Sequence, residues 1–164
     1  MSQRIYPSCH ILEMFMPYLH DEKRLIQVLR TLIEKGFYRN VELPSFPTKE
    51  HRDTVRSVLR DSGVTAITFV APFLNERHMS LCDLDEKRRA EVLDFLKMHA
   101  DYAAECGYMT FGVPSGPYPG DALHDEAMAA QADTLSQIAD YAASLGMLCS
   151  IEPLDRYAHK KALI

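Results

Sequence analysis

Two glutamates stand where a carboxylate could perform acid–base or metal chemistry. Glu152 ends the apolar run 147–151, and Glu42 lies within the short sequence VELP. A carboxylate at the end of a buried parallel strand projects into the mouth of the sheet, where it can ligate a metal or act as a general base. A structural ion pair, for Glu152 with Arg156, is the alternative that the pattern leaves open.

Other polar residues follow the same predicted strands. His10 comes after the first strand, Ser115 opens a loop rich in Gly and Pro after the fourth, and Arg156 follows Glu152. Glycines let backbone N–H groups approach a ligand, and an arginine can fork onto a substrate oxygen. The candidate substrate-binding residues are therefore His10, Glu42, Ser115 and Arg156. Each also has a structural interpretation, such as a neutral histidine with satisfied hydrogen bonds.

Composition excludes several other classes of function. The sequence contains no G-x-S-x-G, H-E-x-x-H, G-x-G-x-x-G or C-x-x-C motif. The net charge of −5 provides no basic surface for nucleic acid, so no nucleic-acid partner is expected. The chain shows neither a signal peptide nor a run long enough to span a membrane, and its four cysteines suit a reducing compartment. We therefore expect a cytoplasmic protein without a membrane partner.

The elements that must position these residues follow a repeated unit. Four times, an amphipathic segment ends in glycine and an apolar run follows at once. Glycine just past a helix end closes the helix in the left-handed conformation without a Cβ clash. The glycines are Gly36, Gly63, Gly107 and Gly146.

This repeat predicts alternating strands and helices. Helices are expected over about 21–35, 48–60, 85–105 and 124–144, with Asp21 and Thr48 as N-caps. Strands are expected over about 5–12, 39–43, 66–71, 109–113 and 148–152, and their near-continuous apolar character predicts burial on both faces. Such alternation indicates an α/β fold with a parallel sheet.

Two architectures accept this order of elements. An open, doubly wound sheet fits the length of 164 residues, whereas a (β/α)8 barrel typically takes about 250 residues. However, no predicted helix covers the last strand, which would leave apolar surface exposed. Residues 1–164 could therefore form either a complete open sheet or one incomplete TIM-barrel domain of parallel β/α repeats with about five of the eight strands. The uncovered last strand favours the incomplete barrel.

The residues around Glu152 also carry a resemblance. The stretch IEPLDRY over 151–157 resembles the pattern E-x-x-(N/D)-R-(F/Y)-E in the fifth strand of the xylose-isomerase-like TIM-barrel superfamily. The second predicted strand, the end of the third helix and the turn at Ser115 are also similar to that superfamily, which includes sugar phosphate isomerases/epimerases and ketose 3-epimerases.

The resemblance implies a metal-dependent reaction on a small-molecule sugar. A divalent metal (Mn, Mg or Co) would be held by Glu, Asp, His and Glu from the last four strands, and two glutamates would exchange a proton through an enediolate. Glu152 matches the first metal ligand and one catalytic carboxylate, and Arg156 matches the motif arginine. Ala158 departs from the ketose 3-epimerase pattern, where a glutamate binds substrate.

The remaining three ligands would lie beyond Ile164. We therefore expect this chain to be inactive alone and to need a homo-oligomer or a completing chain. Two other interpretations stay open. The chain could be a non-catalytic α/β binding or assembly module derived from that fold, or an open-sheet binder of small molecules.

Overall fold

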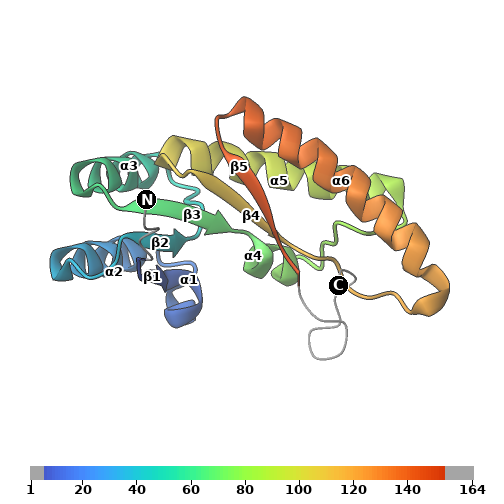
Figure 1. Cartoon of the computed structure of the whole chain (residues 1–164), viewed down its shortest axis with the longest axis horizontal. Coiled ribbons are helices and arrows are strands. Elements are labelled where there is room, and N and C mark those ends of the chain that lie inside the picture. The colour runs from blue at the N-terminus through green and yellow to red at the C-terminus, as the bar shows by residue number, and fades with distance from the viewer. Residues whose placement is uncertain (1–5, 154–164) are drawn as a thin grey trace, which may run out of the picture.

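Five parallel strands form one sheet, in the order in which they occur along the chain (Figure 1). The computed structural model describes residues 6–153. The strands are β1 (Ser8–His10), β2 (Asn40–Leu43), β3 (Thr65–Phe69), β4 (Thr110–Pro114) and β5 (Leu148–Glu152). All four neighbouring pairs are parallel, so the predicted parallel α/β arrangement is confirmed.

Each of the first four strands is followed by helical structure. The four long helices are α2 (Glu22–Lys35), α3 (Lys49–Ser62), α5 (Glu86–Cys106) and α6 (His124–Ser144). They confirm the predicted helices to within one or two residues. Shorter elements are α1 (Ile11–Met14), α4 (Ala71–Glu76) and the 3₁₀ turns η1 (Met16–Tyr18) and η2 (Asp121–Leu123).

Two local predictions were wrong in detail. The first strand is shorter than 5–12 because α1 begins directly after His10. The third strand ends at Phe69 and leads into α4, whose first turn holds Pro72, a position where a missing N–H costs no helical hydrogen bond.

Helix caps follow the sequence with one exception. Asp21 accepts a hydrogen bond from the backbone N–H of Arg24 at 3.0 Å, as a cap should. Thr48 precedes α3, but its hydroxyl instead donates to Glu22 Oε1 at 2.9 Å and so ties α3 to α2.

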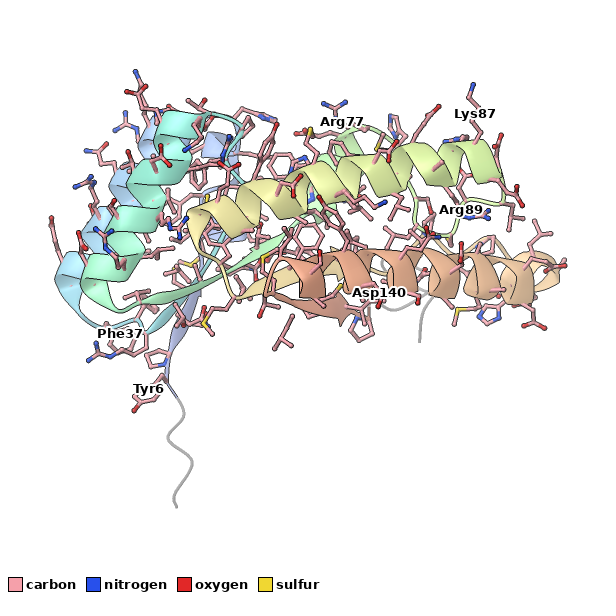
Figure 2. All side chains as sticks on the ribbon, turned by 90° about the horizontal axis from the view of Figure 1, so that it is seen from above. Tyr6, Phe37, Arg77, Lys87, Arg89 and Asp140 are labelled. Atoms are coloured by element: carbon pink, nitrogen blue, oxygen red, sulfur yellow. The ribbon has the colours of Figure 1, made fainter. Side chains whose placement is uncertain are left out.

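Side chains alternate between the two faces of the sheet. Val41, Leu43 and Phe111 are fully buried and belong to one core with the inward faces of the long helices, which cover this face. Figure 2 shows α5 and α6 side by side, with charged side chains such as Lys87 projecting away. Glu42, Ile67 and Phe69 lie on the opposite, inner face and are half-buried.

This arrangement decides between the two architectures. A doubly wound sheet reverses its strand order at a switch point and carries helices on both faces. Here the order runs from β1 to β5 without reversal, and the long helices lie on one face. The fold is therefore a partial TIM barrel, as the incomplete barrel prediction required.

The expected burial of β5 on both faces was wrong. Leu148 is 74% exposed, and within this strand just Cys149 reaches half-burial. The reason is tertiary: among residues 6–153, α6 packs on one side of β5, and no described strand pairs with its far edge. None of the helices in the described part of the chain combines the length and the hydropathy needed to cross a membrane.

A buried histidine joins three elements of the core. His99 of α5 contacts the Ser45 hydroxyl through Nδ1, stacks on Phe73 of α4 at 5.0 Å and packs against Phe95 at 4.3 Å. Burial, together with the positive charge of Arg77, lowers the pKa of His99 from its ordinary value of 6.5 to about 4. The folded protein therefore favours the neutral imidazole.

We predict that acid destabilises the fold through His99. The folded pKa lies below the unfolded one, so stability is fully present above pH 6.5 and is lost as pH falls towards about 4. Between pH 7 and pH 4.5 the unfolding free energy should fall by about 2 kcal/mol more in the natural chain than in His99→Gln. Urea unfolding at both pH values measures this difference. The control is His20→Gln, a change at an exposed histidine. An equal pH dependence in all three proteins would contradict the prediction.

Candidate functional site

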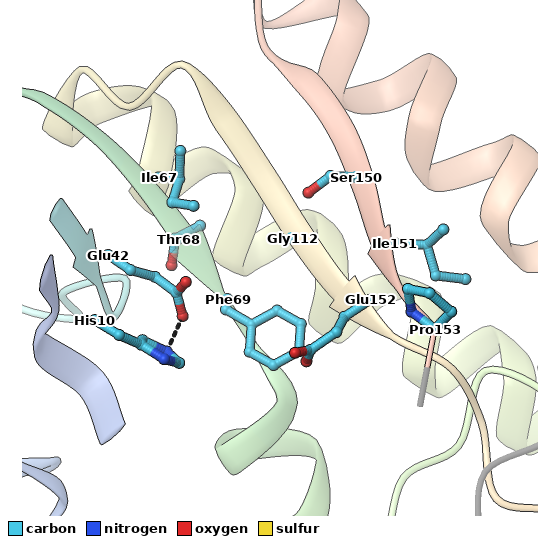
Figure 3. Close-up of a pocket in the computed structure, with 10 residues that line it drawn as sticks. All are labelled: His10, Glu42, Ile67, Thr68, Phe69, Gly112, Ser150, Ile151, Glu152 and Pro153. Atoms are coloured by element: carbon cyan, nitrogen blue, oxygen red, sulfur yellow. Dashed lines mark ion pairs between the residues drawn. The ribbon is translucent and has the colours of Figure 1, made fainter. Parts of the chain in front are cut away.

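A cavity of about 310 Å³ opens on the inner face of the sheet, at the carboxyl ends of the strands (Figure 3). All five strands or their ends contribute to it. Its lining consists of His10, Glu42, Ile67, Thr68, Phe69, Gly112, Ser150, Ile151, Glu152 and Pro153. Binding sites of parallel barrels form at this edge because the loops that follow the strands converge there.

Glu152 is the last residue of β5 and lines the cavity. Its Cα is in register with Pro114 of β4, two residues beyond the pair of Gly112 and Ser150. Side chains two apart on a strand share a face, so Glu152 and Ser150 lie on the inner face together. The structure thus places Glu152 where the sequence put it, while its chemical role stays a prediction.

His10 and Glu42 form a pair on the other side of the cavity. They lie opposite each other in the β1–β2 register, and His10 Nε2 contacts Glu42 Oε1. The second ring nitrogen, Nδ1, lies 3.3 Å from Oε2 of Glu13 in α1. In Figure 3 the ring of Phe69 lies between this pair and the Glu152 carboxylate.

The environment of Glu42 favours its protonated form. Burial raises the pKa of the Glu42 carboxyl above its usual range. His10 opposes this shift, whereas the negative charges of Glu152 and Glu13 add to it. Glu42 and Glu152 therefore interact electrostatically within one site.

The apolar part of the lining was missed by sequence reasoning. Ile67 and Phe69 were counted as members of a strand buried on both faces, but they face the cavity. Gly112 also lines it: a Cβ at this position would lie 2.8 Å from the Thr68 carbonyl oxygen and 3.0 Å from the Phe69 ring. Ser150 could have been predicted, because side chains two residues apart on a strand share a face and Ser150 lies two residues before Glu152.

One predicted site residue does not lie in this cavity. Ser115 is fully buried and absent from the lining, and its backbone N–H donates to the Glu152 carbonyl at 3.1 Å. Its observed contribution is therefore to extend the pairing of β4 with β5. Arg156 lies outside the described residues.

A metal site is not complete within the described part of the chain. Over 6–153, no three His, Cys, Asp or Glu side chains converge to hold an ion. Glu152 offers one carboxylate, whereas Mg²⁺ and related ions prefer about six oxygen ligands. The described residues alone therefore do not fit a bound divalent metal.

Known structures share this fold. A D-psicose 3-epimerase superposes with a TM-score of 0.70 and 20% identity, covering 84% of this chain and 49% of that one. A sugar phosphate isomerase/epimerase from Anabaena variabilis, described as putative, gives a TM-score of 0.67 and 18% identity, covering 93% and 55%. A family 2 AP endonuclease from Brucella melitensis gives 0.66 and 20%, covering 85% and 54%. The chain thus spans about half the length of these proteins, and at such identities the likeness concerns the fold.

Sequence comparison adds a relative and a family. Caprin-2 of Danio rerio is 29% identical over 96 residues, which cover 53% of this chain and 10% of Caprin-2. The family model described as xylose isomerase-like TIM barrel matches residues 29–161. That match covers most of the sequence, including the helices α3, α5 and α6 and the strands from β2 to β5. The chain belongs to the xylose isomerase-like TIM barrel family.

Proposed function

We propose that this chain carries part of the active site of a metal-dependent sugar or sugar phosphate isomerase/epimerase. The observation that carries the proposal is the Glu152 carboxylate in a cavity at the carboxyl ends of the parallel strands. A carboxylate in this position suits proton transfer at a carbon next to a carbonyl group. The names of the structurally similar epimerases support the same reaction class.

In the proposed reaction, Glu152 acts as a general base. Its carboxylate takes the proton from a carbon that bears a hydroxyl group beside the carbonyl. The electrons of the C–H bond form the C=C bond of an enediolate, and the carbonyl oxygen takes up the negative charge. Return of a proton to the other face or to the neighbouring carbon gives the epimer or the isomer.

The lining of the cavity suits a polyol. Ile67 and Phe69 offer an apolar surface for the C–H groups of a sugar, and Ser150, His10 and Glu42 offer polar groups for its hydroxyls. Small-molecule sites commonly combine an apolar surface with a few placed polar groups.

The divalent metal is part of this proposal, with Glu152 as one of its ligands. When bound, Mn, Mg or Co would polarise the oxygens of the sugar. Because the described residues supply one suitable carboxylate, the other ligands must come from outside 6–153 or from another chain. We therefore propose that the chain alone is inactive and acts within a homo-oligomer or with a completing chain.

A second candidate function is a non-catalytic assembly module. Within residues 6–153 no strand pairs with the outer edge of β5, and an unpaired strand edge can offer its N–H and C=O groups to a partner. This feature favours the assembly module. In that case Glu152 would be dispensable for the protein's role.

We predict that ketose binding depends on Glu152. Addition of D-psicose and Mg²⁺ should shift the backbone amide NMR signals around the cavity, at His10, Gly112 and Ser150. The shifts should be lost in Glu152→Gln, which keeps the size of the side chain and removes its charge. Glu126→Gln, an exposed change on the first turn of α6, is the matched control.

Deuterium uptake by the ketose in D₂O, followed by mass spectrometry with added Mn²⁺, tests catalysis in the same samples. No uptake is expected from the chain alone, and uptake would overturn its proposed inactivity. Equal binding by the natural chain and Glu152→Gln, or no shift at the cavity, would favour the assembly module.

We also predict that the cavity surface does not tolerate a side chain at position 112. In Gly112→Ala the new Cβ would meet the Thr68 carbonyl at 2.8 Å, and backbone cannot move aside cheaply. Such overpacking should lower the unfolding free energy by about 1–3 kcal/mol. Ser150→Ala, the register partner on β5, should change it by less than about 0.5 kcal/mol. Urea unfolding compares the two variants, and equal stabilities would refute this account of Gly112.

A further inference from the structure

One imidazole bridges two carboxylates of very different exposure. His10 Nε2 contacts Glu42, whose side chain is 17% exposed and lines the cavity. His10 Nδ1 lies 3.3 Å from Glu13, whose side chain is 70% exposed. The three side chains therefore form a continuous path from the cavity to the solvent.

We propose that His10 relays protons between Glu42 in the cavity and Glu13 at the surface. An imidazole can take a proton at one ring nitrogen while it releases one at the other. The Glu13 carboxyl gives its proton to Nδ1, and Nε2 gives its proton to the Glu42 carboxylate. The ring stays neutral and changes tautomer, Glu42 becomes a carboxylic acid, and Glu13 recovers a proton from water. The reverse transfer carries a proton out.

The surroundings of Glu42 suit this role. Burial raises the pKa of its carboxyl, and the like charge of Glu152 on β5 acts in the same direction, so Glu42 can hold a proton that an exposed glutamate would release. The relay rests on the proposed function, because an acid–base reaction in the cavity is what requires a proton to be delivered there. It adds to that function a proton-carrying group distinct from Glu152.

The relay makes a reciprocal prediction about the ring proton of His10. At about pH 8, where a free imidazole is neutral, ¹⁵N NMR of the ring distinguishes the two tautomers. Glu13→Gln should place the proton on Nε2, facing the remaining carboxylate, and Glu42→Gln should place it on Nδ1. The His10 signals are assigned by their loss in His10→Gln.

A second readout is the ¹³C titration of the Glu42 carboxyl. The pKa of Glu42 should fall in Glu13→Gln, which removes a like charge, and rise in His10→Gln, which removes the favourable partner. The chain offers a matched control in Glu22, whose Oε2 lies 2.8 Å from Nδ1 of His51. Glu22→Gln should alter the ring signals of His51 and leave those of His10 unchanged.

A proton that stays on the same nitrogen in both variants would overturn the relay. Unchanged His10 signals in Glu13→Gln would do so as well, and this exposed change carries little risk to folding. Neither readout uses a sugar or a metal, so failure of the relay is distinguishable from failure of the proposed function. If the tautomer shifts are observed but no ketose binds, the relay is supported and the proposed isomerase/epimerase function is contradicted.

Discussion

The positions of the core and the cavity both depend on the alternation of side chains along the parallel strands. The long connecting helices all cover one face of the sheet, so alternate side chains face either those helices or the cavity. Val41 and Leu43 face those helices, and the residue between them, Glu42, faces the inner surface. The same period places Ser150 and Glu152 on the inner face of β5. A shift of any strand by one residue would exchange core and cavity, so packing of the outer face fixes the position of the inner carboxylates.

On the inner face, several effects on the charge of Glu42 oppose one another. Glu42 and Glu152 repel each other, burial penalises the ionised form of Glu42, and His10 compensates in part. Gly112 keeps this surface open, since even a Cβ there would collide with the backbone of β3. The cavity therefore depends on the absence of a side chain at Gly112 as well as on its polar side chains.

Membership of the family and the function of the chain rest on different grounds. The family match covers 29–161, and the fold is shared with epimerases, isomerases and an AP endonuclease. One fold that accommodates several chemistries leaves the reaction to be inferred from the site. Here the site offers an end-of-strand carboxylate, a carboxylate–imidazole pair and an apolar surface.

The sequence by itself determined the elements and the place of Glu152. Helix ends at Gly36, Gly63 and Gly107 and the apolar runs after them are local signals, because cap geometry and hydrophobic period depend on neighbours in the chain. Tertiary structure alone decided that Phe69 faces a cavity, that Ser115 is buried away from it, and that Glu13 and Glu42 share one imidazole. These are relations between segments far apart in sequence or between the two faces of a strand, and they arise only when packing against α2, α3, α5 and α6 assigns one face of the sheet to the core.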